Sequence, residues 1–264
     1  MHNDEDLSLP FAETGAMVRA RIERARNYGG KVLELTPEIE QQLRDRDREI
    51  ERQLNAIRNP PIEQRFARIV GAAYAGCRLD NFVIGLAWTE KQRQQAESVL
   101  KRLRSCLKDL ESGIRLGRGI VLCGPPGVGK DHLLAGLLWE ALTRNCAIAW
   151  TNGAKFSASA LDQFSEHRVP ERQWLERWVE PSVLAISDPD GTREDGLTGH
   201  VKQQLYNVLD ARIREGKSTW ITINGTSPKV WAERLDPRNW DRLAKDAWIL
   251  HCDWPSGRKP RGEV

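Results

Sequence analysis

The segment from Gly124 to Lys130, GPPGVGK, constrains the fold of this chain more than any other feature. It fits the spacing G-x-x-x-x-G-K, follows the apolar run IVLC at residues 120–123 and opens a stretch whose leucines recur at helical spacing. In such a strand, loop and helix, backbone N–H groups turn inward around phosphate oxygens, and the helix N-terminus favours their negative charge. We therefore expect a phosphate-binding loop rather than a glycine turn with an incidental lysine. The residues expected at the phosphates are Gly124, Pro125, Pro126, Gly127, Val128, Gly129, Lys130, Asp131 and His132.

The rest of the second half of the chain alternates short apolar runs with amphipathic stretches. The runs expected to form strands are residues 120–123, 146–150, 182–187, 219–223 and 247–252. Apolar residues at helical spacing predict helices over residues 130–143 and about 200–215, and an earlier one from Thr89 to Glu111. Unbroken apolar strands separated by helices are typical of a parallel sheet that is covered on both faces. The predicted fold class is therefore α/β.

The N-terminal part of the chain is polar and contains one clear helical pattern. Thr36 is a suitable N-cap, Pro37 suits the first helical turn, and apolar residues recur at helical spacing up to Asn59. The opposite face carries a dense run of charges, which predicts either a solvated helix face or a partner-binding surface. We expect a small helical and partly flexible N-terminal region, residues 1–80, followed by a P-loop domain, residues 81–264.

Composition narrows the class of protein. The 264 residues suffice for a buried core, and 40 Lys and Arg against 37 Asp and Glu leave a net charge of +3, which does not by itself indicate nucleic-acid binding. The five cysteines are scattered without C-x-x-C spacing, so we expect reduced thiols rather than a zinc site or disulfides. The sequence has no signal-peptide pattern and no window of membrane-spanning length, and we expect a cytoplasmic protein without membrane contact.

Asp131 stands at the position where P-loop proteins carry the Ser or Thr that places a hydroxyl on Mg²⁺. A carboxylate is also a hard oxygen ligand, and it is favoured in the first turn of a helix. Its charge opposes a triphosphate unless a metal ion lies between them. We therefore expect nucleotide binding together with an unusual Mg²⁺ site that includes Asp131.

A second acidic element is expected at the end of another apolar strand, and the run VLAISDPDG at residues 183–191 supplies it. Two adjacent acids usually stand there, one for Mg²⁺ and one that positions or activates water. Two registers are open here. Either Asp188 is the metal ligand and Pro189 replaces the second acid, or Ser187 replaces the metal carboxylate and Asp188 activates water. Asp190 can compensate in both, and the alternative is that Asp188 and Asp190 only end the strand through Asx-turn chemistry.

Three further residues complete the predicted catalytic set with Asp188 and Asp190. Asn224 ends an apolar run and is suited to orient water near the terminal phosphate. Arg238 and Arg242 lie four residues apart on an expected helix, hence on one face. An arginine there can stabilise phosphoryl-transfer charge in a neighbouring subunit, and the alternative is a pair of salt-bridged surface arginines.

Four motifs follow one another along the chain: GPPGVGKDHL, ISDPDG, TINGTSP and RNWDRL. Together they resemble the AAA+ ATPases of the DnaC/IstB-like group, bacterial helicase loaders and transposition helpers. The stretches SASALDQF and AWILHCDWPSGR narrow the resemblance to DnaC-type loaders, and it covers roughly residues 80–258. The resemblance implies a three-layer AAA+ P-loop domain that binds ATP with Mg²⁺ at Asp131 and Asp188. The interrupted acid pair departs from the family's pattern, so we expect at most weak hydrolysis of ATP.

The same resemblance implies partners. Copies of the chain are expected to assemble through their AAA+ domains. An arginine of one copy would then complete the neighbour's site, with Arg242 as the first candidate and Arg238 as the second. The implied activity is loading of a replicative helicase onto single-stranded DNA. The helicase would be bound by the N-terminal region through the helix at residues 36–58, although residues 1–75 match none of the family's motifs.

The family binds single-stranded DNA near the segment that follows the second strand, so the resemblance implies that this segment contacts DNA here. Lys155 and Phe156, with Phe164 nearby, could offer charge and a stacking face, and the alternative for the phenylalanines is core packing. The basic tail at residues 258–261 could contact phosphates or remain solvated. Two other functions remain open: a helper ATPase for a transposase, and a non-hydrolysing nucleotide-dependent adaptor, which Asp131 and the interrupted acid pair suggest.

Overall fold

The computed structural model of the chain describes residues 17, 20, 36–164, 169–190, 197–225 and 227–258, except for the side chains of residues 53–58 and 164. The chain divides into two compact units, Met1–Pro61 and Ile62–Val264.

The first unit contains helix α2, Pro37–Arg58, which confirms the helix expected there. The Thr36 hydroxyl accepts a hydrogen bond from the backbone N–H of Ile39 at 3.4 Å, as an N-cap does. Three ion pairs link charged residues one turn apart on this helix, for example Arg44 with Glu40 at 2.9 Å, and all of their side chains are largely exposed. Exposed pairs of this kind contribute roughly 0.2–1 kcal/mol each, so the charged face is a solvated one.

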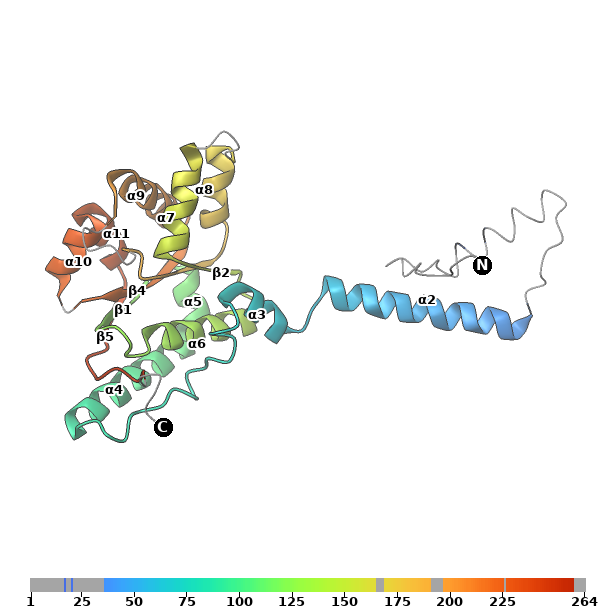
Figure 1. The fold of residues 1–264 in the computed structure, drawn as a ribbon, viewed down its shortest axis with the longest axis horizontal. Coiled ribbons are helices and arrows are strands. Elements are labelled where there is room, and N and C mark those ends of the chain that lie inside the picture. The colour runs from blue at the N-terminus through green and yellow to red at the C-terminus, as the bar shows by residue number, and fades with distance from the viewer. Residues whose placement is uncertain are drawn as a thin grey trace, which may run out of the picture. The chain divides into compact units, whose positions relative to one another are not determined.

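The second unit is built on a five-stranded sheet with the order β2-β3-β4-β1-β5 (Figure 1). The strands are β1 Ile120–Gly124, β2 Ile148–Asn152, β3 Val183–Ser187, β4 Ser218–Asn224 and β5 Trp248–His251. Every neighbouring pair is parallel, which confirms the predicted sheet. In register, Gly124 lies beside Asn224 and Ser187 lies beside Thr222. The carboxyl ends of β1, β3 and β4 therefore meet at one edge.

Helices cover both faces of the sheet, so the unit has three layers (Figure 1). The helices on one face are α3 Ile62–Val70, α4 Glu90–Cys106, α5 Leu110–Arg115 and α6 Lys130–Thr143, with a 3₁₀ turn, η1 Leu107–Asp109, before α5. The other face carries α7 Gly153–Leu161, α8 Glu171–Val179, α9 Gly199–Arg214, α10 Pro228–Leu235 and α11 Pro237–Ala244, with the turn η2 Asp162–Phe164. Successive strand residues point to opposite layers, since Ile120 and Leu122 enter the first core whereas Val121 and Cys123 enter the second.

Two parts of this unit differ from the expected outline. The single helix expected from Thr89 to Glu111 is divided, because α4 ends at Cys106 and the 3₁₀ turn precedes α5. Its start is as predicted, since Thr89 and Gln92 form a reciprocal capping box. Helix α3 buries Phe66 and Val70 in the first core, so residues 62–80 pack with the P-loop unit although the sequence groups them with the N-terminal region.

Two further expectations concern cysteines and membranes. All five cysteines are unpaired, and Cys123 and Cys252 are buried, as reduced core thiols would be. Among the helices that the structure describes, none has the length and apolar character needed to cross a bilayer.

Candidate nucleotide-binding site

The loop from Gly124 to Lys130 joins the end of β1 to the start of α6, as its sequence predicts. Gly124 is required by a close approach, because a Cβ atom there would collide with the backbone oxygen of Cys252. Gly129, the N-cap of α6, has a φ of +90°, and a Cβ atom there would lie 2.7 Å from the Phe82 ring. The glycines therefore let neighbouring chain segments close around the loop.

Lys130 is nearly buried, with 5% of its surface exposed. Its Nζ donates hydrogen bonds to the backbone oxygens of Gly124 at 3.1 Å and Pro125 at 2.8 Å, and to Oδ1 of Asn224 at 2.8 Å. Burial lowers the pKa of Lys130, and the nearby charge of Asp188 opposes that shift. The structure thus brings Lys130 and Asn224 together, and phosphate oxygens can replace the acceptors that hold the ammonium group.

The carboxylate of Asp131 accepts three hydroxyl hydrogen bonds from different elements. Ser187, the last residue of β3, donates to Oδ1 at 2.9 Å, and Thr222 of β4 donates to the same atom at 2.8 Å. The phenol of Tyr74 donates to Oδ2 at 3.2 Å. Thr222 also accepts a hydrogen bond from the backbone N–H of Asp188 at 3.1 Å. Asp131 is therefore the point at which the P-loop helix is tied to the carboxyl ends of β3 and β4.

Asp188 follows β3 with a φ of +43°, a left-handed conformation that Asp tolerates better than most residues. Burial raises the pKa of its carboxyl group to about 6, with a further contribution from the charge of Asp131. Its Oδ1 atom is buried and has no hydrogen-bond partner within the described part of the chain. Of the two registers left open by the sequence, this geometry favours the one with Ser187 in the place of the metal carboxylate and Asp188 beside it.

Asp190 has a different environment from Asp188. It is 1% exposed and forms an ion pair with Arg234 of α10 at 3.0 Å. Burial raises the pKa of Asp190, and Arg234 opposes that rise. Asp190 is not among the described residues that line the P-loop cavity, but its charge acts on Asp188, and its Oδ1 atom is buried without a hydrogen-bond partner in the described chain.

A cavity of about 740 Å³ opens over the P-loop, within the size range of small-molecule sites. Its lining includes the P-loop residues from Pro126 to His132, together with Asp188 and Asn224. His132 lies there with Nε2 2.9 Å from Oδ1 of Asn81. The remaining lining residues are Tyr74, Asn81, Phe82, Val83, Trp88, Gly257 and Arg258. This apolar and aromatic wall beside a phosphate-binding loop can accommodate a base next to its phosphates.

Sequence reasoning missed the aromatic wall and the position of Arg258. Trp254 donates its Nε1–H to the backbone oxygen of Val128 at 2.8 Å, and the N–H of Gly257 donates to the oxygen of Gly127 at 3.0 Å. These two bonds fasten the segment after β5 to the P-loop and bring Arg258 to the cavity. The sequence signal was the stretch AWILHCDWPSGR, but only the pairing of β5 with β1 shows that it returns to this edge.

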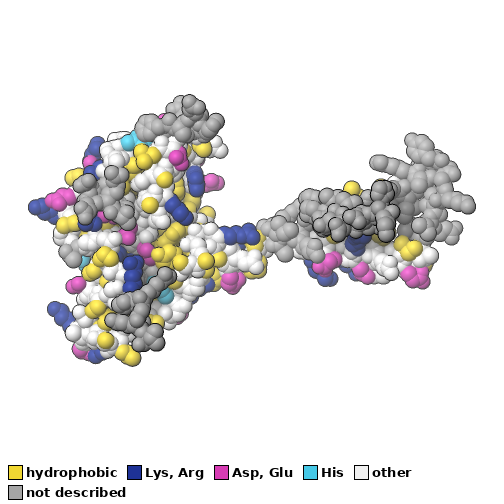
Figure 2. Space-filling model, in the orientation of Figure 1, with side chains coloured by type: hydrophobic (Ala, Val, Ile, Leu, Met, Phe, Trp, Pro, Cys, Tyr) yellow, Lys and Arg dark blue, Asp and Glu magenta, His cyan; other side chains and the backbone are white. Residues whose placement is uncertain are grey.

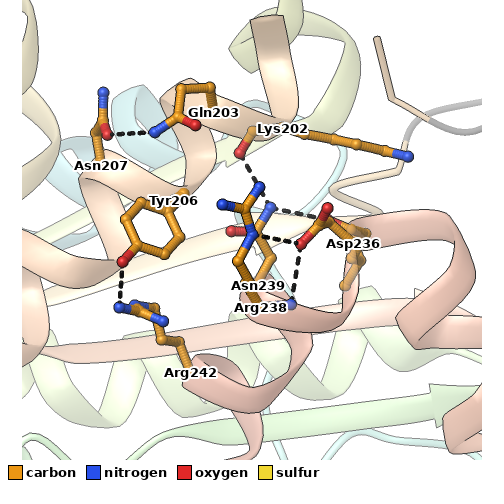
Figure 3. A network of polar contacts seen from close by, with 9 residues as sticks. Lys202, Gln203, Tyr206, Asn207, Asp236, Arg238, Asn239 and Arg242 are labelled. Atoms are coloured by element: carbon orange, nitrogen blue, oxygen red, sulfur yellow. Dashed lines mark hydrogen bonds and ion pairs between the residues drawn. The ribbon is translucent and has the colours of Figure 1, made fainter. Parts of the chain in front are cut away.

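Arg238 and Arg242 share one face of α11, as predicted, and Figure 3 shows both beside α9. Arg242 forms an ion pair with Asp210 at 3.0 Å, donates to the hydroxyl of Tyr206, and lies 4.0 Å from the centre of that ring. Arg238 is 65% exposed and contacts Asp236, the N-cap of α11. Neither arginine is among the described residues that line the P-loop cavity.

The residues considered for binding single-stranded DNA differ in how exposed their side chains are. Phe156 is fully buried and its ring lies 5.4 Å from that of Trp178, so core packing accounts for it and stacking on a base does not. Lys155 is exposed at the start of α7. The side chain of Phe164 and the tail beyond Arg258 lie outside the described residues.

The strand order and the loop between β1 and α6 define this unit as an AAA+ P-loop fold. In sequence the chain is similar to the replicative helicase loader DnaC of Escherichia coli K12, with 24% identity over 164 residues. That match covers 61% of this chain and 63% of DnaC, which is less than two thirds of the relative. No protein-family model matches the chain.

Solved structures agree on the fold. A crystal structure of the DnaC helicase loader aligns with a TM-score of 0.57 and 18% identity over 69% of this chain and 99% of that chain. The replication initiator DnaA bound to AMPPCP and single-stranded DNA aligns with a TM-score of 0.53 and 14% identity over 69% of this chain and 50% of that chain. The chain is therefore similar to DnaC in sequence and shares the fold of these solved structures, and its activity is a separate question.

Proposed function

We propose that this protein is an ATP-binding AAA+ protein that loads a replicative helicase onto single-stranded DNA. The observation that carries the proposal is the similarity in sequence to the loader DnaC across a domain whose P-loop keeps its glycines and its lysine. The DnaA structure with AMPPCP and single-stranded DNA has the same fold, which supports both ligands for this chain.

The residues at the P-loop fit ATP with Mg²⁺. Lys130 and the loop N–H groups would bind the phosphates, and Arg258 adds a second cation at the same cavity. The carboxylate of Asp131 is a hard oxygen ligand at the end of the sheet, which suits Mg²⁺, and the unpartnered Oδ1 of Asp188 adds negative charge beside it. When bound, the ion would neutralise charge on the phosphates.

Asp188 and Asn224 support slow ATP hydrolysis. Asp188 lines the cavity and can accept a proton from water. Asn224 can orient that water when the Lys130 ammonium group binds phosphate oxygens instead of the Asn224 amide oxygen. The second candidate function, a non-hydrolysing adaptor, is favoured by Ser187 at the position of the usual strand carboxylate. The test measures release of phosphate from ATP by the parent protein and by Asp188→Asn. Release by the parent that is lost in the variant supports hydrolysis, whereas no release by the parent supports the adaptor.

Self-association through the AAA+ domains is proposed from the arginines of α11. They are not among the described residues that line the P-loop cavity of their own chain, as expected of arginines that complete a neighbouring site. The test mixes the Lys130→Ala variant with an Arg238→Ala, Arg242→Ala double variant, each inactive alone. If the arginines act in trans, the mixture recovers part of the ATP turnover; turnover that stays at the level of the separate variants argues against that role.

The loader function is tested with the replicative helicase of the same host. The expected result is co-purification with the helicase and ATP-dependent transfer of the helicase to a single-stranded circle. Lys130→Ala serves as the control, since it should retain the fold but lose the dependence on ATP. Failure to bind the helicase with and without ATP contradicts the proposal, even if ATP binding is normal.

A further inference from the structure

We infer that this chain has exchanged the two protein groups of the Mg²⁺ site: Asp131 on the P-loop helix supplies the carboxylate, and Ser187 at the end of β3 supplies the hydroxyl that orients it. The inference rests on the proposed function, because it concerns the ion that accompanies ATP. It specifies which end of the pair contacts the metal and so goes beyond the binding of a nucleotide.

The ordinary P-loop site is made of a hydroxyl after the P-loop lysine and a carboxylate at the end of a neighbouring strand, and both hold Mg²⁺. In this chain the same two groups are present and adjacent, but at opposite positions. Oγ of Ser187 donates to Oδ1 of Asp131 at 2.9 Å, so the hydroxyl now comes from β3 and the carboxylate from α6.

The surroundings of the pair are built for a carboxylate at position 131. Besides Ser187, the hydroxyls of Thr222 and Tyr74 donate to Asp131, so donors from three elements fix its orientation. A ligating carboxylate is usually held in this way by hydrogen bonds from residues behind it. Ser187 itself is 7% exposed and lies beside Thr222 in register, so little room is left there for a larger side chain while Asp131 is present.

A second observation indicates that a cation belongs at this place. The Oδ1 atom of Asp188 is buried without a hydrogen-bond partner in the described chain, close enough to Asp131 for the two charges to interact. Leaving a buried acceptor unsatisfied is costly, and a cation near both carboxylates would remove that cost. Across the described residues there is no group of three or more His, Cys, Asp or Glu side chains that could hold a metal alone. Mg²⁺ with one or two carboxylates and substrate phosphates needs no such group.

The exchange predicts that the two positions compensate for each other. Asp131→Ser alone leaves two hydroxyls and no carboxylate in the exchanged pair, with Asp188 as the carboxylate nearby, and Ser187→Asp alone sets the two carboxylates of the pair against each other. The double variant Asp131→Ser, Ser187→Asp restores one of each in the ordinary arrangement and also conserves the total side-chain volume. A pair that merely fills space or joins two elements would not restore metal dependence in this way.

The experiment measures the affinity of the full chain for a non-hydrolysable ATP analogue, once with Mg²⁺ and once with EDTA. The readout is the factor by which Mg²⁺ improves binding. We expect this factor to be about tenfold or more smaller in each single variant than in the parent, as is typical when groups around a metal site are changed. In the double variant the factor should return to within about threefold of the parent's value. Thermal unfolding without ligand or metal shows whether each variant folds.

The near-isosteric variant Asp131→Asn keeps the test decisive should the double variant not fold, since it removes the charge and little else. The Asn variant should bind the analogue in EDTA but gain little from Mg²⁺. Two results would overturn the exchange while leaving nucleotide binding in place. One is an Asp131→Asn variant whose affinity improves with Mg²⁺ as much as that of the parent. The other is a folded double variant whose affinity improves with Mg²⁺ no more than that of the worse single variant. A parent protein that binds no nucleotide in either buffer overturns the proposed function itself, and the exchange with it.

Discussion

Two buried cations occupy opposite ends of the parallel sheet, and they are held in different ways. Arg212, at the end of α9, is fully buried beside the residues that lead into β3 and β4. Its guanidinium donates to the hydroxyl of Thr219 and to backbone oxygens; these belong to Trp178, Val179, Pro181, Ser182 and Ser218. Lys130, at the carboxyl ends, has two backbone oxygens and the amide oxygen of Asn224.

The difference separates a structural cation from a binding one. The donors of Arg212 are fixed in a planar fork, and they bond backbone oxygens of the segments that lead into β3 and β4. Burial lowers the pKa of Arg212 to about 9, which still leaves it charged at neutral pH. The acceptors of Lys130 face a cavity of about 740 Å³, where other oxygens can enter. Hydrogen bonds to backbone carbonyls hold both cations, so they do not by themselves identify a structural one. The cavity beside Lys130 is what marks it as a binding residue.

The largest expected effect is on stability, from Arg212→Ala. Removing the guanidinium leaves several backbone oxygens buried without donors, and each buried acceptor left unsatisfied costs about 1–3 kcal/mol of unfolding free energy. Urea unfolding followed by circular dichroism measures the change. Nucleotide affinity of the folded fraction should be unaltered.

Arg214→Ala is the matched control for Arg212→Ala, two residues along the same helix. Arg214 forms an ion pair with Asp210 at 2.8 Å but its side chain is 78% exposed, so its loss should cost less than about 1 kcal/mol. Equal destabilisation by the two variants would contradict the structural role of Arg212.

The second effect is on binding, from Lys130→Ala. Truncating one partner of a buried charged contact typically costs about 2–5 kcal/mol, so the dissociation constant for ATP should rise by roughly 30-fold or more. The unfolding midpoint without nucleotide should change little, because the freed acceptors can be hydrated from the cavity. Titration of a fluorescent ATP analogue measures the affinity, and Lys101→Ala, an exposed lysine of α4, is the control. A parallel loss of stability would make Lys130 resemble Arg212 and remove the contrast.

The contrast between these two cations also marks what the sequence could predict. Lys130 was predictable because the glycine spacing, the preceding apolar run and the following helix all indicate one arrangement. Arg212 was not, because an arginine in the last turn of a helix usually interacts with the helix dipole at the surface. Only the path of the chain before β3 and β4 surrounds it with carbonyls.

The candidate site shows the same limit. The parallel sheet follows from its apolar runs, but strand order does not, and strand order alone brings Ser187 and Thr222 to Asp131. For that reason the sequence left two registers open at Asp188, and the hydrogen bond from Ser187 favours one of them. Asp190 entered the predicted set because it can compensate in either register, and nothing in the sequence indicated its ion pair with Arg234.

A smaller effect is expected at the rim of the cavity, from Arg258→Ala. This arginine is exposed, and exposed charge pairs contribute roughly 0.2–1 kcal/mol, which corresponds to a loss of ATP affinity of at most about fivefold. Arg258→Lys keeps the charge and should lose less. The affinity measured at two salt concentrations should fall more steeply for the parent than for Arg258→Ala. An effect as large as that of Lys130→Ala would instead indicate that the segment after β5 closes over the nucleotide.

The smallest expected effect comes from Tyr74→Phe, which removes one of the three hydroxyl donors to Asp131. Burial, reinforced by the charge of Asp131, raises the pKa of Tyr74 to about 12, so the phenol remains a donor throughout the neutral range. Its bond at 3.2 Å is the longest of the three, and Ser187 and Thr222 still donate to the other carboxylate oxygen. A single hydrogen bond contributes about 0.5–1.5 kcal/mol, and we expect a loss near the lower end in unfolding free energy with the Mg²⁺ gain in nucleotide affinity preserved. Collapse of the Mg²⁺ gain in Tyr74→Phe would mean that Asp131 depends on every donor, as Arg212 depends on its acceptors, and the binding end of the sheet would then be as rigid as the structural end.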